Sequence, residues 1–577
     1  MEKRYILFLI AGFLAFSVQA AGQEAEELKL GDEPAQVEKP SEKKGKAPLE
    51  VIIKGEGGSD EPSTTGEDEP PSWAQSGETE KSQPDKAPPE KEDSAEGAEE
   101  GFVPWGKEEG IPTAPEDRDF RFSAGATMKA RAEMAENVED LNSSRYDFDL
   151  RFGHRIRGFV LGEYKDALRL KASIQDARYW GEESATSDLW LDGLSRGFGT
   201  VLHEGYIEID KPGGAPILLR AGRMELSYGS ELIIGRDDWN LVSNAFDAAL
   251  LRTMFKELDV DIFYSRVRAE EIIVHPYGPC SQTVSRAGCM ASGEHLAGID
   301  LRLKTISYMN AEFYTFFTKS SPVQGDTLTR EDFTDDDSTL VTMGIFTSDP
   351  GKGEAVYRAE LDFQFGKVPS GDFKLERESH RAFALMLKGG YRGSGYLKPL
   401  VVGGYAFATG DDKPSPEDSV SGAFRQLFPS NHEYFGVMDL AGLSNIHNIN
   451  LSGRITPVEL LELELSLNYF LLQKYRDGWR GADGETIGKS AAPGYRTFYG
   501  FYDRSGNSGL PVGFEIDFIA DWSPIKHLSL KSESGLFFPG TFPKSAARLD
   551  ENKLPNKTPL LGGNAAFLWL ITTSLAF

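Results

Sequence analysis

Arginine is the residue type in this sequence best suited to bind an anion, because its planar guanidinium pairs with a carboxylate through two parallel hydrogen bonds. Nine arginines fall at positions that we expect on the inward face of the fold: Arg131, Arg151, Arg178, Arg220, Arg223, Arg236, Arg252, Arg358 and Arg454. Carboxylates expected on the same face are Asp149, Glu204, Asp300, Glu360 and Asp362. Either the arginines form a field for anions together, or each one fills the wall in a pair with an acid. For any single arginine, a pair with an acid is at least as good an interpretation as a role in anion binding. For the nine arginines together, a shared electropositive field is favoured.

The chain around these arginines alternates between polar and apolar residues. Arg151 and Arg155 lie on one parity, while Phe152 and Ile156 lie on the other. The same alternation returns in three later segments: 357–365, 461–469 and 514–522. A period of two indicates β-strands with one wet face and one apolar face. About 18 such strands fit between residues 119 and 577, and an even number is expected of a bacterial barrel.

The first 118 residues differ in composition from the rest of the chain. Residues 1–20 combine a basic start, an apolar run and a small-residue end, which is typical of a secretory signal peptide. Residues 21–118 hold 27 acidic residues, 11 basic residues and 12 of the 31 prolines. Such a segment cannot bury enough apolar surface to fold, so we expect a disordered acidic tail in the periplasm. The tail is either a passive linker, which is favoured, or a docking arm for a periplasmic partner.

The charged face of the strands at 119–577 decides the fold class. A soluble sandwich would turn this face to bulk water, whereas a membrane barrel would turn it to a lumen and its apolar face to lipid. The secretion signal, the long polar loops and the aromatic residue Phe577 at the end of the last strand favour the barrel. Long connections such as 409–444 are expected as extracellular loops or as loops folded into the pore. We therefore predict an all-β fold with a single antiparallel transmembrane β-barrel of about 18 strands. A barrel of this size leaves an aqueous lumen.

Two sequence blocks carry a family resemblance. The first block holds Tyr228, Gly229, Asp238, Trp239, Phe246 and Asp247, and the second holds Phe428, Pro429, His432 and Asp439. With the strand pattern from residue 119 onward, they resemble the alginate export porin family. The resemblance implies an outer-membrane barrel with an arginine-rich constriction that passes an anionic polysaccharide. It does not establish alginate as the permeant, and the acidic tail has no counterpart in the family pattern.

On this resemblance we expect an outer-membrane porin of a Gram-negative bacterium, and not an enzyme. It would pass an anionic carbohydrate polymer such as alginate by diffusion, because a polyuronate offers one carboxylate per sugar to inward arginines. The alternatives are an uptake porin for small solutes, an outer-membrane lipase and a structural barrel. The lipase would use Ser529 and His527, which share a parity, but no third member and no Gly-x-Ser-x-Gly elbow accompany them.

Other features give weaker expectations. Cys280 and Cys289 would form a local disulfide in an external loop. The acidic runs 335–337 and 411–412 could bind Ca²⁺, although a solvated loop is favoured, and we expect neither a metal site nor a cofactor. The net charge of −28, from 90 acidic and 62 basic residues, argues against a nucleic-acid partner. The expected partners are outer-membrane lipid and an anionic polysaccharide or small solute.

Overall fold

The structure is a computed structural model. It describes residues 111–112, 119–138, 141, 148–180, 199–268, 293–304, 306–321, 338–351, 353–369, 377–411, 420–482, 489–490, 498–499, 501, 503, 507–546 and 563–577. The expected signal peptide at 1–20, nearly all of the expected tail at 21–118, and the residues Cys280 and Cys289 lie outside the described residues. The acidic run 335–337 also lies outside them.

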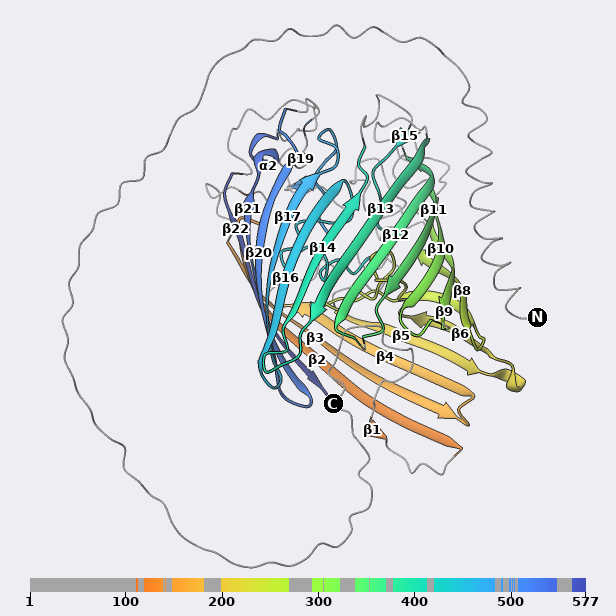
Figure 1. The fold of residues 1–577 in the computed structure, drawn as a ribbon. Helices are drawn as coiled ribbons and strands as arrows, with labels where there is room; N and C mark the ends of the chain where they lie inside the picture. Colours follow the sequence, from red (N-terminus) through yellow and green to blue (C-terminus); the bar gives the residue numbers. More distant parts are fainter. Residues whose placement is uncertain are drawn as a thin grey trace, which may run out of the picture. The chain divides into compact units, whose positions relative to one another are not determined.

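Within the described residues, eighteen long strands form one antiparallel sheet that closes on itself (Figure 1). The strands of the wall are β2 (Phe120–Glu136), β3 (Asp149–Tyr164), β4 (Leu168–Tyr179), β5 (Gly199–Asp210), β6 (Ile217–Met224), β7 (Phe246–Met254), β8 (Leu258–Arg268), β9 (Gly293–Leu303), β10 (Asn310–Ser321), β11 (Thr339–Ser348), β12 (Ala355–Pro369), β13 (Arg377–Arg392), β14 (Leu400–Ala408), β16 (Ile446–Val458), β17 (Leu461–Leu472), β20 (Pro511–Ile525), β21 (Leu528–Pro539) and β22 (Ala566–Ala576). The ring closes because β2 pairs with both β3 and β22. The predicted antiparallel barrel of 18 strands is confirmed.

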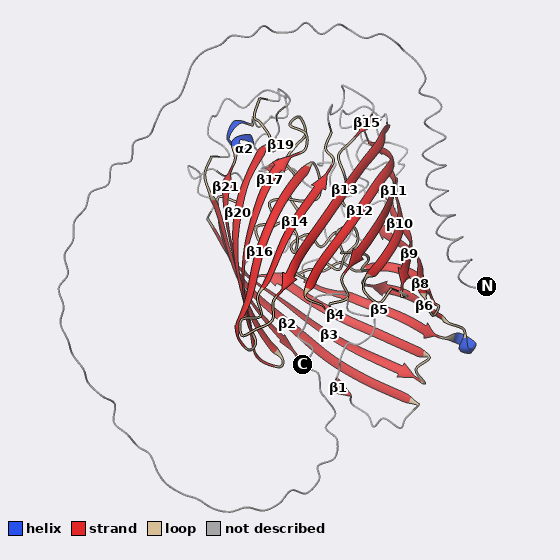
Figure 2. Cartoon of the chain, viewed as in Figure 1, coloured by secondary structure: helices blue, strands red, loops and turns tan. Residues whose placement is uncertain are grey.

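The remaining elements are short, and Figure 2 shows that strands dominate the described chain. They are β1 (Ile111–Pro112), β15 (Val420–Ser421), β18 (Lys489–Ser490), β19 (Phe498–Tyr499), the 3₁₀ turn η1 (Pro212–Gly214) and the helix α2 (Thr541–Ser545). Over the described ranges, no helix has both the length and the apolar character needed to cross a bilayer.

Most strand boundaries agree with the expected ones within a few residues, and β13 shows why others do not. The sequence predicts this strand over 382–392, whereas it begins at Arg377. Its first outward residues are Arg377, Ser379 and Arg381, so the apolar half of the alternation is missing there. A polar outward face near one end of a strand therefore conceals where the strand begins.

Alternate residues of each strand point to opposite faces, and the two faces of the wall differ. On β3, Leu150, Phe152 and Ile156 are exposed on the outer face, whereas Gly153 and Arg155 are buried on the inner face. The period of two in the sequence thus records the alternation between the outer surface and the lumen. An apolar outer surface around a charged interior is the arrangement of a membrane-spanning barrel.

The two ends of the barrel differ in the length of their connections. At one end, the turn end, the strands are joined by tight connections such as 165–167, 255–257 and 526–527. At the other end, the loop end, the connections include the long segments 225–245 and 409–445. Bacterial barrels have short turns in the periplasm and longer loops outside the cell.

Two loop-end connections fold into the lumen. The first inner loop, residues 225–245, joins β6 to β7, and the second inner loop, residues 409–445, joins β14 to β16. β6 has 8 residues and β7 and β14 have 9 each, whereas β2 has 17 and β13 has 16. Because these three strands are short, both loops leave the wall part-way along the barrel. The sequence predicted the second as an external or pore-folded loop over 409–444, but it did not predict the first as an insert.

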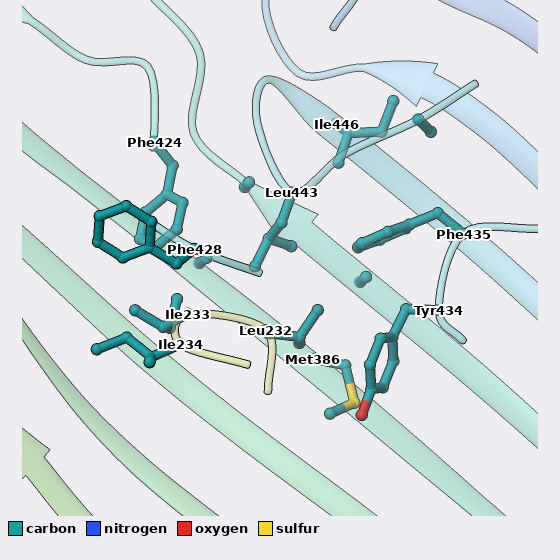
Figure 3. Packing of buried hydrophobic residues seen from close by; sticks show 14 of the residues in the cluster. Leu232, Ile233, Ile234, Met386, Phe424, Phe428, Tyr434, Phe435, Leu443 and Ile446 are labelled. Atoms are coloured by element: carbon teal, nitrogen blue, oxygen red, sulfur yellow. The ribbon is translucent and has the colours of Figure 1, made fainter. Parts of the chain in front are cut away.

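The two inner loops pack on each other through backbone hydrogen bonds and a shared apolar core. The N–H of Gly235 donates to the carbonyl of Phe428 at 2.8 Å, and the N–H of Phe428 donates to the carbonyl of Ile233 at 2.8 Å. Figure 3 shows the buried side chains of this core: Leu232, Ile233, Ile234, Met386, Phe424, Phe428, Tyr434, Phe435, Leu443 and Ile446. Each large apolar side chain buried here stabilises the packing by roughly 1.5–3 kcal/mol. The loops therefore share an apolar core with inward residues of the wall, such as Met386 on β13.

Close approach of the short strand β6 to β5 depends on Gly222. Its φ is +129°, and an added Cβ would lie 2.2 Å from the carbonyl oxygen of Gly205. We expect Gly222→Ala to lower the free energy of unfolding by about 2–3 kcal/mol, because backbone strain and a backbone clash act together. Urea unfolding of the barrel in detergent micelles measures this effect.

The matched control for this prediction is Gly453→Ala. An added Cβ at Gly453 meets no atom within 4 Å, so we expect a change within about 0.5 kcal/mol. Equal unfolding midpoints for the two variants would contradict the role of Gly222.

Candidate functional site

Four cations on the inner face of β2 and β3 hold the first inner loop against the wall. We call Lys129, Arg131, Arg155 and Arg157 the basic wall cluster. The guanidinium of Arg155 lies 2.9 Å from the Asp238 carboxylate, and the side-chain nitrogens of Lys129 and Arg157 lie 3.8 and 3.7 Å away. Burial alone would raise the pKa of Asp238, but Arg155 and Lys129 hold it well below its usual range. Asp238 is therefore an ionised anchor at neutral pH.

The same cluster binds carbonyl groups of the loop backbone. The Nζ of Lys129 donates to the carbonyl of Asp238 at 2.6 Å, and Arg131 donates to the carbonyl of Trp239. Carbonyls that leave the sheet and enter the barrel need such donors, because an unpaired buried acceptor is destabilising. Of the nine predicted arginines, Arg131 is the one that belongs to this cluster, and it acts as an anchor.

Trp239 and His432 join the two inner loops next to this cluster. Their rings stack with centroids 3.6 Å apart, and the Arg131 guanidinium lies 4.1 Å from the Trp239 ring centroid. The two ring nitrogens of His432 lie 2.9 Å from Asp439 and 3.2 Å from Glu533. Burial alone would lower the pKa of His432, but the two carboxylates raise it to about 9. His432 is therefore a cation at neutral pH and an ionic link between loop and wall.

Carboxylates on other strands of the wall bind backbone amides of the inner loops. The N–H of Gly229 donates to Glu312 on β10 at 2.8 Å, and the N–H of Met438 donates to Glu515 on β20 at 3.0 Å. Glu360 on β12 accepts a hydrogen bond from the N–H of Ser230 at 3.2 Å. Wall acids thus satisfy loop donors in the same way as wall cations satisfy loop acceptors.

Several residues predicted to face inward form pairs with neighbouring side chains of the wall. The Nε of Arg220 donates to Glu208 at 2.7 Å, and Arg252 makes two 2.6 Å hydrogen bonds to Asp261. Other such pairs are Lys171–Glu204 at 2.6 Å, Arg302–Asp300 at 2.8 Å, Tyr314–Asp362 at 2.6 Å and Arg151–Asp149. These residues therefore fill the wall as pairs of opposite charge or as hydrogen-bonded pairs, and they do not form a field that binds anions.

Four lumen-facing cations near the turn end remain partly exposed. We call Arg358, Lys388, Arg454 and Lys531 the passage cluster. Arg358 lies 2.9 Å from the Glu433 carboxylate, and Lys388 donates to the Glu433 carbonyl at 3.3 Å. The side chains of Arg358, Arg454 and Lys531 are 24%, 45% and 32% exposed. Burial alone would raise the pKa of Glu433, but Arg358 and Lys388 lower it, and Lys531 adds to this effect.

Three of the predicted inward arginines lie elsewhere. Arg178 and Arg223 are on the outer face of the wall, where they pair with Asp176 at 2.7 Å and Asp247 at 2.8 Å. The inward prediction is wrong for both, because near the loop end the outer face also carries polar residues. Arg236 is not on a strand but in the first inner loop, 2.9 Å from Glu231.

The other residues of the two family-like blocks meet where the inner loops pack. Tyr228 is buried and stacks on Phe263 with centroids 5.2 Å apart, and Phe246 packs edge-on against Phe428 at 5.4 Å. Pro429 follows Phe428 at this junction and is partly buried. These residues stabilise the insert, so these parts of the blocks mark the packing of the inner loops.

The serine and histidine of the lipase alternative are not brought together. Ser529 faces the lumen, and its hydroxyl donates to Asp521 at 3.1 Å. His527 lies in the connection that precedes β21, and its carbonyl accepts the N–H of Ala576 at 3.0 Å. Among the described residues, no hydrogen bond joins the two side chains.

One group of side chains in the described part of the chain has metal-ligand spacing. Potential ligand atoms of His203, Glu204 and Glu225 lie within 4.8 Å of one another. Lys171 lies 2.6 Å from Glu204, and Arg157 lies 3.3 Å from Glu225, so both carboxylates already have a cationic partner. A metal ion would have to displace these cations.

Five inward cations that bind the inner loops or line the passage are not among the nine arginines expected on the inner face. The missed residues are Lys129, Arg155, Arg157, Lys388 and Lys531. Each has the parity of a polar strand face, so the same alternation that selected Arg151 and Arg358 would have found them.

The sequence profile of the family described as alginate export matches residues 120–555. The chain belongs to the alginate export family. Its closed barrel and its family are those of a porin-type channel.

Among solved structures, Acinetobacter baumannii OccAB1 has 9% identity and a TM-score of 0.46, with 79% of this chain and 96% of that chain covered. Pseudomonas aeruginosa OpdL has 11% identity and a TM-score of 0.45, with 79% and 98% covered. A search of curated proteins gave no match.

Neutralising Asp238 should loosen the first inner loop. Asp238→Asn removes the carboxylate that faces Lys129, Arg155 and Arg157, and because Asp238 is half exposed we expect a cost of about 1 kcal/mol. Proteolysis of the loop in the folded barrel should become faster. Asp247→Asn, which changes an acid on the outer face, is the control and should leave the loop as resistant as in the wild type.

The charged His432 gives the loop packing a defined pH dependence. Because the pKa of His432 is raised to about 9, its ionic contribution is complete below its ordinary pKa near 6.5 and is lost as the pH rises through 9. We expect the free energy of unfolding to fall by about 3 kcal/mol between pH 6.5 and pH 10 through this group. Urea unfolding at several pH values measures the fall. His432→Gln should show a smaller decrease, and an equal decrease in both proteins would contradict the assignment.

Proposed function

We propose that the channel passes an anionic carbohydrate polymer, such as alginate or a related polysaccharide, across the outer membrane by diffusion. The observation that carries the proposal is the passage cluster, in which Arg358, Arg454 and Lys531 keep exposed surface inside the barrel. These side chains are accessible from the lumen, unlike the fully paired cations Arg220 and Arg252 in the wall.

The acids beside the passage cluster support transit and not permanent binding. Arg454 lies 2.8 Å from Glu464 and 3.2 Å from Glu462, and Arg358 lies 2.9 Å from Glu433. Partly exposed ion pairs of this kind contribute about 0–1 kcal/mol each. A uronate carboxylate can therefore displace the acid side chain from its cation at little cost in free energy. It can also dissociate again when the next sugar of the polymer arrives. Conduction needs binding of this weak, multi-site kind.

The inner loops define which part of the lumen can conduct. Asp238, Trp239 and His432 anchor the loops against β2, β3 and β21, so the basic wall cluster is covered by protein. The polymer would pass the passage cluster on the side of β12, β13 and β16. The loop end would face the exterior of the cell, and the turn end would face the periplasm. β2 begins at Phe120, at the turn end. The acidic tail that precedes β2 would then lie in the periplasm.

An uptake channel for small solutes is the second candidate. It is favoured by the acids that keep exposed surface beside the passage cluster, such as Glu433 and Glu462, which give the interior both signs of charge. A small solute with a cationic and an anionic group would use both kinds of group. Ion selectivity and polymer block distinguish the two candidates.

Removing the passage cluster should weaken polyanion binding in the pore. With the full chain in a planar bilayer, the triple variant Arg358→Gln, Lys388→Gln and Arg454→Gln should need about tenfold more oligouronate for the same block of ion current. This factor corresponds to three exposed pairs worth roughly 0.5 kcal/mol each. The reversal potential in a salt gradient should shift away from anions in the same variant.

The matched control is Arg178→Gln, which removes an arginine from the outer face and should leave block and selectivity unchanged. A neutral oligosaccharide of equal length should not distinguish any of the proteins. A wild-type channel that prefers cations, or oligouronate block that is equal in the triple variant, would contradict the polyanion proposal.

A further inference from the structure

A row of basic residues crosses the outer face of the barrel near its loop end. The residues that face each other across neighbouring strands are Arg266 and His295, His295 and Lys319, Lys319 and Thr339, Thr339 and Lys367, and Lys367 and Ser379. Arg377 and Arg381 lie on either side of Ser379 on β13. We call Arg266, His295, Lys319, Lys367, Arg377 and Arg381 the outer basic row. It is one continuous level of the sheet, from β8 to β13.

The outer basic row points away from the lumen. Arg266, Lys319 and Lys367 are exposed, and each has the parity of exposed apolar neighbours on its own strand: Tyr264 on β8, Phe317 on β10 and Phe365 on β12. The inward residues of the same strands, such as Asp261 and Glu360, are buried. The row therefore cannot contribute to the passage through the barrel.

Charge on this part of the outer face is confined to the loop end. Below the row, the outward residues of β10, β12 and β13 toward the turn end are apolar, small or hydroxylated: Ala311, Phe313, Thr315 and Phe317, then Ala355, Tyr357, Ala359, Leu361, Phe363 and Phe365, then Phe383, Leu385, Leu387, Gly389 and Tyr391. The row thus lies at the upper edge of the apolar band that faces the membrane core. Cations at this edge are at the depth of lipid headgroups.

Three cations of the row, Arg266, Lys319 and Lys367, form no ion pair with a carboxylate of the described residues. The acid at this level on the neighbouring strand β7 is Asp247, and both of its carboxylate oxygens are bound by Arg223, at 2.8 and 2.9 Å. A surface that served solubility alone would mix both signs of charge. Over the described part of this level, the three cations have no acidic side chain bound to them.

An apolar depression in the outer wall lies next to the row. It has a volume of about 390 Å³, and its outward lining includes Leu219, Ala221, Ala249, Leu251, Ile262 and Tyr264. The small side chains Ala221 and Ala249 on adjacent strands leave this space between larger neighbours. Tyr264, at its edge, is two positions from Arg266 on the same face of β8. Cationic and apolar contacts therefore adjoin each other on one surface.

We propose that the outer basic row binds the phosphates of the phosphorylated glycolipid in the outer leaflet, and that one acyl chain occupies the depression. Guanidinium and ammonium groups are the usual partners of phosphate. Lys319 and Lys367 are two strands apart, which is about 10 Å at the strand spacing of a sheet. A disaccharide headgroup with a phosphate at each end spans a comparable distance. The row holds the glycolipid while the lumen carries the permeant, so the two activities are separate.

Binding of purified lipid A to the full chain in mild detergent, followed by native mass spectrometry, tests the proposal. The probes are bisphosphorylated lipid A and the same lipid after removal of both phosphates. The triple variant Arg266→Gln, Lys319→Gln and Lys367→Gln should bind the phosphorylated probe on the order of 100-fold more weakly than wild type, as three interfacial cations imply. The dephosphorylated probe should bind weakly and equally to both proteins.

The lumen variant Arg358→Gln, Lys388→Gln and Arg454→Gln is the matched control, because it removes the same charge and should bind lipid A as wild type does. Heat-modifiable migration in gels verifies that each barrel is folded, and Lys319→Arg with Lys367→Arg should keep the affinity. Unchanged lipid A binding in the outer triple variant would overturn the proposal. An equal loss for the phosphorylated and the dephosphorylated probe would also overturn it, because the phosphates would then not be the groups recognised.

Discussion

The buried backbone of the inner loops sets the charge pattern of the lumen wall. A segment that folds into the barrel brings N–H and carbonyl groups without strand partners, and each unpaired group would cost about 1–3 kcal/mol. The charged side chains of the wall satisfy these groups: cations of β2 and β3 donate hydrogen bonds to carbonyls of the first inner loop, and acids of β10, β12 and β20 accept hydrogen bonds from amides of both loops. Side-chain anchors such as Arg155–Asp238 then fix the position of the insert.

Because the wall charges must satisfy the backbone of the inner loops, the number of charged residues in the lumen does not determine the electrostatic field that a permeant meets. Arg131 and Arg155 face inward, but they are engaged by the first inner loop. Arg220 and Arg252 are engaged by wall acids. Only cations that keep exposed surface, such as Arg454, present charge to a molecule in transit. Most of these inward arginines therefore hold loops or pair with wall acids, and the cations that a permeant would meet are the small exposed subset.

The strands of the wall could be predicted from the sequence, whereas the inward folding of the two loops could not, and the reason is physical. Period two is a local property of each strand, so 18 strands and the inward orientation of Arg358 and Arg454 followed from it. Partner choice is not local: the pairing of Arg155 with Asp238 depends on a loop that is distant in sequence. Near the loop end both faces of the wall are polar, so parity could not separate the outward Arg178 from the inward Arg151. The family-like blocks around Trp239 and His432 marked the inner loops, but residue spacing alone did not reveal that they fold inward.

The short strands β6 and β7 leave a notch in the wall. Beyond Met224 and Phe246, the neighbouring strands β5 and β8 continue toward the loop end without a partner on that side. The first inner loop closes this notch, and His203 on β5 holds its first residue, Glu225, by a 2.8 Å hydrogen bond. The first inner loop is thus a fixed part of the barrel wall, because moving it out of the notch would expose the unpaired edges of β5 and β8 to the membrane. The first inner loop therefore occupies the lumen as a fixed element of the wall, so that the interior of the barrel is shaped by the lengths of two strands.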